Sequence, residues 1–345
     1  MNGWRPEWAQ LGGFRSTGTG SLLGRSMPME SSEARSTNRW SWGLIGTMLL
    51  LFFSCQPDNP IVVTPATAQL PALVVLMLIG MRLVGTTRRL PNLVVAADAL
   101  LQMTLFTLAG ILLSHAIAAR GGALWDARLA RADTLLGLDW PALRALLDES
   151  EAIVWLLAIA YHSLIAQMIA VILVLAAVGK HAELRLLILA AILAGFGTIL
   201  VSALVPALGN LFDAGSYRHL LPSVASIHAD IVTGLRDGSL RVIDLRRVMG
   251  IVTFPSYHAA LAILFIWALR QVPRTRRAGT ALATLTILAT PINGGHYGVD
   301  VLAGLLLGVL ALGCARYASA PANSALLIAS GRQFRASSPL HRAPP

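Results

Sequence analysis

The chain has 345 residues, of which 55% are hydrophobic and only 13% are charged. With a mean hydropathy of +0.66, it has too few charged side chains to cover a soluble globule of this length. The basic residues behind its formal net charge of +10 lie mostly in tails and short turns. That placement indicates membrane topology and lipid headgroups, and it gives no reason to expect nucleic acid as a partner.

Apolar stretches predict about eight membrane-spanning helices, several near the ~20 residues that one crossing needs. Only helices or closed barrels satisfy backbone polar groups in lipid, and these stretches lack the alternation of a barrel. We therefore expect an all-α polytopic bundle. The stretches cover about residues 41–55, 70–81, 93–119, 152–178, 186–207, 255–269, 278–293 and 299–315.

Composition divides the chain into five segments. Residues 1–39 and 321–345 are polar and without periodicity, so we expect disordered cytoplasmic tails. Between them we expect N-terminal transmembrane helices over 40–119, an extracytoplasmic amphipathic segment over 120–151, and a transmembrane core over 152–320 that contains the motifs described below.

Basic residues also predict which loops lie in the cytoplasm. With a cytoplasmic N-terminus, the turns Arg82–Arg89, Lys180–Arg185 and Arg270–Arg277, together with Arg316, all fall inside, in keeping with the positive-inside bias. The loop 208–254 and both motifs below then face outward. We expect a multi-pass protein of the plasma (inner) membrane with an extracytoplasmic site.

Polar and small residues within the apolar stretches predict contacts between helices. Asp98, Gln102, His162 and Gln167 are expected to hydrogen-bond between spans. The pattern Gly304-x-x-x-Gly308 is expected to allow close packing of its helix against a neighbour.

The segment Phe254-Pro255-Ser256-Tyr257-His258 begins one apolar stretch. A proline at the first helical position leaves the backbone N–H groups of Tyr257 and His258 free, and such a helix start attracts phosphate oxygens. Ser256 can add a hydroxyl donor, cap the helix, or do both. We therefore expect Ser256 and Tyr257 to bind phosphate.

A second segment, Gly295-His296-Tyr297-Gly298-Val299-Asp300, begins the last apolar stretch. His296 and Asp300 are four residues apart and would share one helix face, so the carboxylate can hold one imidazole nitrogen protonated while the other attacks. This is the pattern of a histidine nucleophile with its orienting acid. Two histidines at the starts of neighbouring membrane helices favour a phosphoryl-transfer site, with His258 as general acid and base.

These motifs resemble the type 2 phosphatidic acid phosphatase superfamily, whose second motif reads Pro-Ser-x-His and whose third ends in His-x-x-x-Asp. Ser256, His258, His296 and Asp300 stand at the matching positions. The family's Lys-x6-Arg-Pro motif is absent, and Ala289-Thr290 stand where the third motif normally begins Ser-Arg. With these departures, residues 120–317 are similar to the inositol-phosphotransferase branch, which includes the inositol phosphorylceramide synthases. The resemblance implies a phosphatidic acid phosphatase-like catalytic core.

Together, the residues and the resemblance predict a metal-independent phosphatase or phosphotransferase. His296 would attack the phosphorus of a membrane lipid phosphate and form a phosphohistidine, and His258 would protonate the leaving group and then activate water, an alcohol or inositol. Cations must meet the phosphate charge. Because the family's basic motifs are missing, we expect these cations on the loop before Pro255: Arg218, Arg241, Arg246 and Arg247.

Two other functions compete with the enzyme. The chain would be a transporter if Asp98 and His162 carried a proton or solute, or it would be a non-catalytic membrane subunit. The paired histidine motifs favour the enzyme. The sequence has no Cys/His cluster, Gly-x-Gly-x-x-Gly or Walker loop, so we expect neither a metal site nor a cofactor.

Overall fold

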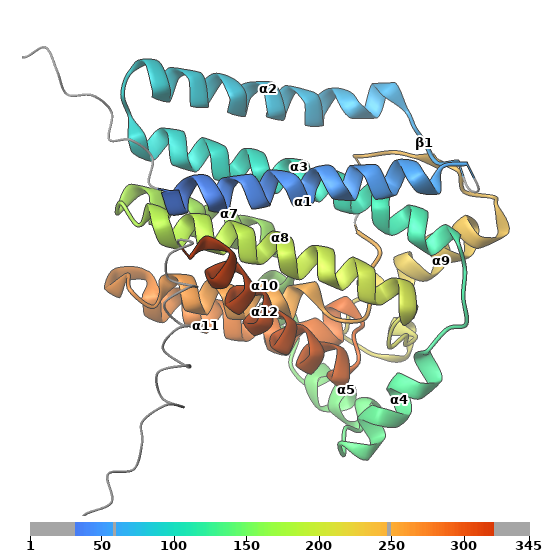
Figure 1. Cartoon of the computed structure of the whole chain (residues 1–345). Coiled ribbons are helices and arrows are strands. Elements are labelled where there is room, and N and C mark those ends of the chain that lie inside the picture. Colours follow the sequence, from blue (N-terminus) through green and yellow to red (C-terminus); the bar gives the residue numbers. More distant parts are fainter. Residues whose placement is uncertain (1–31, 58–59, 247–249, 321–345) are drawn as a thin grey trace, which may run out of the picture. The chain divides into compact units, whose positions relative to one another are not determined.

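The computed structural model describes residues 32–57, 60–246 and 250–320. Its only described strands, β1 (Val62–Val63) and β2 (Val242–Ile243), form one short parallel pair. All other regular structure in these residues is helical, so the predicted all-α class is confirmed (Figure 1). The α-helices are α1 (Ser32–Cys55), α2 (Pro65–Thr87), α3 (Pro91–Ala119), α4 (Asp126–Leu135), α5 (Trp140–Asp148), α6 (Glu151–His162), α7 (Leu164–Ala177), α8 (His181–Leu204), α9 (Val224–Asp237), α10 (Tyr257–Leu269), α11 (Pro273–Ala289) and α12 (Gly298–Ser319), with a 3-10 turn at Ala214–Ser216 and a π-helical turn at Thr290–Gly294.

Among the described helices, α2, α3, α8 and α12 are long and apolar enough to cross a membrane. Helices α6 and α7 qualify together as a fifth span, bent by 56°. The protein is therefore a multi-pass membrane protein, but the eight predicted spans are not confirmed. Each predicted stretch lies largely in helix, yet α10 and α11 have only 13 and 17 residues, and α1 includes Arg35 and Arg39.

Helix α1 begins at Ser32, ahead of the boundary expected at residue 40. The side chains of its first turns bond to the end of α12, with Ser36 Oγ donating to the Ala318 carbonyl (3.0 Å) and Thr37 Oγ1 to Ser319 Oγ (2.9 Å). Residues 32–39 are thus helical, which corrects the prediction that they belong to a disordered tail. Residues 1–31 and 321–345 of the predicted tails lie outside the described residues.

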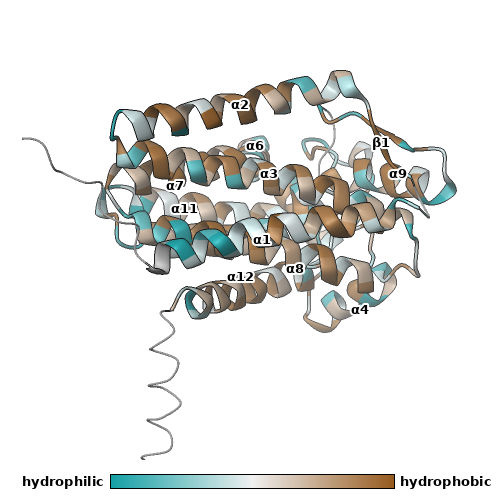
Figure 2. Cartoon of the chain, turned by 45° about the horizontal axis from the view of Figure 1, so that its top comes forward, coloured by the Kyte–Doolittle hydropathy of each residue, from teal (hydrophilic) through white to brown (hydrophobic). Residues whose placement is uncertain are grey.

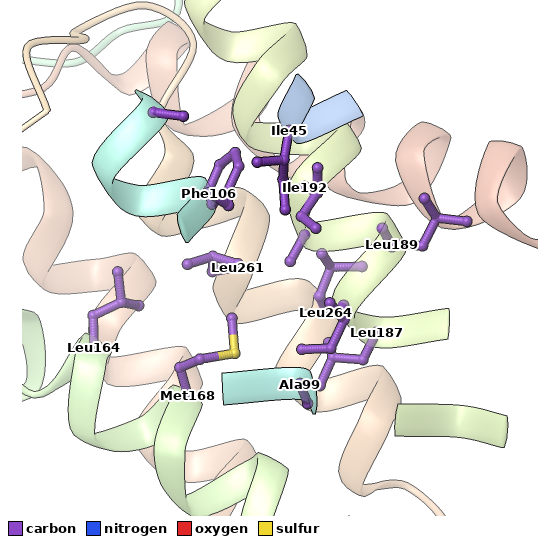
Figure 3. Close-up of a cluster of buried hydrophobic side chains, with 14 of the residues drawn as sticks. Ile45, Ala99, Phe106, Leu164, Met168, Leu187, Leu189, Ile192, Leu261 and Leu264 are labelled. Carbon is purple, nitrogen blue, oxygen red and sulfur yellow. The ribbon is translucent and has the colours of Figure 1, made fainter. Parts of the chain in front are cut away.

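The apolar core is built around α8, which packs against α1, α3, α10 and α12. Figure 3 shows Leu187, Leu189 and Ile192 of α8 beside Phe106 of α3 and Leu264 of α10, all of them buried. Helix α2 is different, since only 11% of its most apolar window is buried. Much of its ribbon has the brown colour of hydrophobic residues in Figure 2, as expected for a helix that faces lipid.

Helices α6 and α7 break at Ser163, and polar side chains satisfy the carbonyl that the break leaves free. The Ala160 carbonyl accepts hydrogen bonds from Thr286 Oγ1 of α11 (3.0 Å) and from Gln167 Nε2 (3.3 Å), and Gln167 also donates to Thr286 Oγ1 (2.8 Å). An unpaired carbonyl in an apolar interior is costly, so these contacts stabilise the bend. The last residues of α6, Tyr161 and His162, are thereby held against the centre of the bundle.

Three of the four polar residues predicted to join neighbouring helices do so. The contacts are Asp98 with Arg82 Nε (2.5 Å), Gln102 Nε2 with Asn38 Oδ1 (2.7 Å) and Gln167 with Thr286. The fourth, His162, lines a cavity. The ion pair of Asp98 gives this carboxylate a structural role, which weakens the transporter hypothesis.

Helices α10 and α12 cross at the two glycines predicted to allow close packing. A Cβ on Gly304 would lie 2.2 Å from the Ser256 carbonyl oxygen, and one on Gly308 would lie 2.8 Å from the Ala260 carbonyl oxygen. The two backbones approach so closely that no side chain fits between them. The packing role of these glycines is confirmed.

The basic turns gather at one end of the helices and the starts of α10 and α12 at the other (left and right in Figure 1). At the basic end, Lys180 Nζ donates to Gln271 Oε1 (3.1 Å), and a ring nitrogen of His181 lies 2.8 Å from Asn92 Oδ1. Turns that are distant in sequence therefore meet at the end away from both histidine motifs.

The glycine crossing predicts a difference between two alanine substitutions in α12. Gly308→Ala places a methyl group against backbone and should lower the free energy of unfolding by about 1–3 kcal/mol. Gly313→Ala is the matched control, because a Cβ there meets nothing within 4 Å and alanine favours helix. Thermal unfolding in detergent measures both. Equal stability of the two variants would contradict the close crossing.

Candidate functional site

A cavity of about 310 Å³ opens among α3, α6, α7, α8, α9 and α10. Its polar side is formed by His162, His228, His258 and His296, and its other walls are largely apolar, as at Phe106 and Ile199. The structure thus brings the two histidine motifs to one cavity, although 38 residues of sequence separate them. A cavity with an apolar wall and a few convergent polar groups is typical of a ligand-binding site.

Ser256 caps α10. It has extended backbone angles (φ −71°, ψ 116°), is fully buried, and its Oγ accepts a hydrogen bond from the Ala259 N–H (3.4 Å). The helix begins at Tyr257, so Pro255 precedes the cap and does not occupy the first helical position as predicted. In the described part of the chain, no group accepts a hydrogen bond from the N–H of Tyr257 or His258. These two donors are free at the helix start, where an anion is favoured.

His296 lies before α12, whose cap is Tyr297, and not on the same helical face as Asp300. The pair nevertheless forms, because Asp300 in the first turn reaches back toward the cap. Its Oδ2 accepts the Tyr297 N–H (2.9 Å) and lies 3.4 Å from Nδ1 of His296. Asp300 is fully buried and His296 is 5% exposed. The carboxylate therefore directs Nδ1 and leaves Nε2 as the nitrogen available for reaction.

One backbone hydrogen bond joins the motifs, from the Ser256 N–H to the Asp300 carbonyl (3.0 Å). A side chain from α6 joins them again, because the ring of Tyr161 stacks on the ring of His258 with centroids 4.2 Å apart and planes 7° apart. His258 is thus held by its own helix and by a neighbouring ring. The hydroxyl of Tyr257 donates to the Ala191 carbonyl of α8 (3.1 Å), which anchors the start of α10.

Two aspartates of the predicted amphipathic segment hold the second motif. Asp133, which is 1% exposed, accepts hydrogen bonds from the N–H of Gly298 (2.7 Å) and of Val299 (2.9 Å). Asp126 accepts one from the Tyr297 hydroxyl (3.2 Å). Burial, together with the charge of Asp126, raises the pKa of Tyr297, which remains a protonated donor. A carboxylate at a helix N-terminus is favourable, so the segment braces the start of α12.

The sequence ranks His228 of α9 below the loop arginines as a group that could meet phosphate charge. Its side chain lines the cavity beside both motif histidines, and its Nε2 is buried without a hydrogen-bond partner among the described residues. Burial, with smaller effects of His296 and His115, lowers the pKa of His228 to about 4, so its imidazole is neutral near pH 7. A histidine outside the two motifs therefore also faces the cavity.

None of the described arginines predicted to bind phosphate lines this cavity. Arg218 is exposed, Arg246 is paired with Asp244 (2.7 Å), and Arg241 is half-buried beside Gly238. Arg247 lies outside the described residues. Contact between these arginines and phosphate stays a prediction.

A buried cation that the sequence analysis missed lies close behind the second motif. Arg144 of α5 is 5% exposed, and its Nη2 donates to the Asn210 carbonyl (3.2 Å). The Asn210 N–H in turn donates to the Gly295 carbonyl (2.6 Å), next to His296. Burial lowers the pKa of Arg144, and Tyr217 opposes this effect. Arg144 stabilises the turn before His296, but it does not line the cavity.

Within residues 32–57, 60–246 and 250–320, no group of three or more His, Cys, Asp or Glu side chains has a geometry that could hold a metal ion.

The sequence matches a known protein family. The sequence model of the PAP2 superfamily matches residues 127–314, a range that contains both histidine motifs and the braced start of α12. No curated protein and no solved structure matches the chain significantly.

The hydrogen bonds from Gly298 and Val299 to Asp133 predict that Asp133→Asn destabilises the protein. The amide loses the charge that favours the start of α12 and turns an N–H donor toward other donors, so the free energy of unfolding should fall by about 1–3 kcal/mol. Asp213→Asn is the control, since Asp213 is exposed and bonds only within its own turn, to Gly215 and Ser216. Thermal unfolding of both variants in detergent measures the difference. An unchanged unfolding midpoint for Asp133→Asn would show that Asp133 does not stabilise the start of α12.

Proposed function

This chain belongs to the PAP2 superfamily, and from that premise we propose that it is an integral membrane lipid phosphatase or phosphotransferase that works through a phosphohistidine. Members of the superfamily are phosphatases or phosphotransferases. The observation that carries the proposal is the arrangement of His258 and His296 on one cavity, with the buried carboxylate of Asp300 behind His296. An apolar wall beside these groups suits the chain of a lipid substrate.

In the first step, Nε2 of His296 attacks phosphorus and a P–N bond forms as the P–O bond to the leaving group breaks. His258 gives its proton to the departing oxygen. Asp300 near Nδ1 stabilises the positive charge that develops on the imidazole of His296. The products are a phosphohistidine and a free alcohol, or a phosphohistidine and a lipid monophosphate if the terminal phosphorus of a lipid diphosphate is attacked.

In the second step, an acceptor hydroxyl attacks the phosphohistidine. Neutral His258 takes the proton from the acceptor oxygen, a P–O bond forms and the P–N bond to His296 breaks. Water as acceptor gives a phosphatase, and an alcohol gives a phosphotransferase. Because the motifs resemble those of the inositol-phosphotransferase branch, we propose inositol or an inositol-containing lipid as one of the substrates.

Phosphate charge must be balanced as the reaction proceeds. The free N–H groups of Tyr257 and His258 are two donors at the start of α10, the helix that Ser256 caps. Arg218, Arg241, Arg246 and Arg247 remain the proposed cations of the outer loop. They would act by drawing lipid phosphate toward the cavity within the ~8 Å screening length of physiological salt.

We place the chemistry on the extracytoplasmic side of the plasma membrane. This proposal is supported by the basic turns, which lie together at the end of the bundle away from the histidine motifs. The positive-inside bias assigns that end to the cytoplasm.

A panel of lipid phosphates offered to the purified protein, with and without inositol, tests the proposed function. Wild type should release phosphate or form a new phospholipid. His296→Ala should show no turnover above background, and Asp300→Asn should lose about 10²–10⁴-fold in kcat, because it weakens control of the imidazole. His181→Ala, at the opposite end of the helices, is the control and should keep full activity. Full activity in His296→Ala would eliminate the mechanism.

Thiol labelling tests the proposed side of the membrane. In a background of Cys55→Ala and Cys314→Ala, Ser239→Cys should react with a membrane-impermeant thiol reagent in intact cells, because it is exposed on the loop near the cavity. Thr87→Cys, exposed in a basic turn, should react only after lysis. The reverse pattern would place the reaction in the cytoplasm.

A further inference from the structure

Tyr161 lies at the end of α6, where the helix bends, and it lines the cavity together with His258 and His296. We propose that its hydroxyl donates a hydrogen bond to the phosphoryl group that is transferred between these histidines, while its ring orients His258. The inference rests on the proposed function and names a further residue that touches the substrate.

The ring of Tyr161 fixes the position of the hydroxyl. It is stacked almost parallel on His258, and its edge meets the ring of His162 in a T-shaped contact with centroids 5.2 Å apart. Tyr161 is only 5% exposed, so packing leaves its ring little freedom. The bend that carries it is held by the contacts of Thr286 and Gln167 with the carbonyl of Ala160, the residue before Tyr161.

The hydroxyl lies in the neighbourhood of the second histidine. A Cβ built on Gly294 would lie 2.8 Å from the Tyr161 hydroxyl oxygen and 2.7 Å from Cδ2 of His296. Both atoms are therefore close to one point, and their separation cannot exceed the sum of these two distances. Because Cδ2 is bonded to Nε2, the hydroxyl lies near the nitrogen that is proposed to attack phosphorus. Gly294 lacks the side chain that would push the two apart.

Three tyrosines surround the site, and their hydroxyls differ in one respect. The hydroxyl of Tyr257 donates to the Ala191 carbonyl, and that of Tyr297 lies 3.2 Å both from Asp126 and from the Gly209 carbonyl. The hydroxyl of Tyr161 has no hydrogen-bond partner among the residues that the structure describes. A tyrosine hydroxyl in a buried setting normally has a partner, so a group in the cavity is the expected acceptor.

A neutral phenol suits this role. It donates its O–H to an equatorial phosphoryl oxygen without transferring the proton, and this interaction strengthens as negative charge develops on that oxygen. Among the described residues, no arginine or lysine lines the cavity, so a fixed neutral donor is one of the few groups there that can contact the phosphoryl oxygens directly. Loss of one such donor typically lowers kcat by about 10²–10³-fold.

Two substitutions separate the hydroxyl from the ring. Tyr161→Phe keeps the stack on His258 and should lower kcat by about 10²–10³-fold with little change in KM. Tyr161→Leu also removes the stack and should lower kcat further. Tyr317→Phe, on an exposed tyrosine near the end of α12, is the control and should match wild type. Thermal unfolding in detergent confirms that each variant is folded.

Binding of vanadate, which imitates the transition-state geometry of phosphoryl transfer, gives a second measurement that needs no turnover. Its stabilisation of the folded protein should be weaker in Tyr161→Phe than in wild type or Tyr317→Phe. Wild-type kcat and vanadate affinity in Tyr161→Phe, beside an inactive His296→Ala, would overturn the role of Tyr161 and leave the proposed function intact. If wild type transfers no phosphate from any lipid, the proposed function fails. In that case, unchanged vanadate affinity in Tyr161→Phe would also overturn the role of Tyr161.

Discussion

The close crossing of α10 and α12 is the contact on which the site depends. Gly304 and Gly308 let the two backbones approach until the Ser256 N–H bonds to the Asp300 carbonyl. That approach places the starts of both helices side by side, so His258 and His296 face one cavity. A larger residue at either glycine would separate the helices, and the histidines would then belong to two unrelated helix ends.

Carboxylates in the segment between α3 and α6 give the site its rigidity. Asp133 braces the start of α12, and Asp126 accepts hydrogen bonds from the N–H of Leu208 (3.1 Å) and Gly209 (2.9 Å) as well as from Tyr297. Polar groups that would be costly without partners in this apolar protein are thereby satisfied by side chains. The same contacts hold His296 in place without occupying its Nε2.

Local pattern predicted the features that depend on nearby residues. The apolar stretches became helices, the spacing of His296 and Asp300 correctly predicted their contact, and the motifs indicated the superfamily that the sequence match confirms. The eight predicted spans were not confirmed because α10 and α11 have only 13 and 17 residues and α1 includes Arg35 and Arg39. The bend at Ser163 was not predictable, because Thr286, which is distant in sequence, helps to hold it. The contact of Tyr161 with His258 was not predictable for the same reason, because it depends on the packing of helices that are distant in sequence.

The proposed mechanism requires that phosphate is held on His296 during turnover. Rapid quenching of the purified protein with a lipid phosphate, followed by mass spectrometry under conditions that preserve acid-labile P–N bonds, tests it most directly. We expect a phosphorylated peptide with the modification on His296 in wild type and none in His296→Ala. Phosphate trapped on another residue, or turnover that continues in His296→Ala, would contradict it.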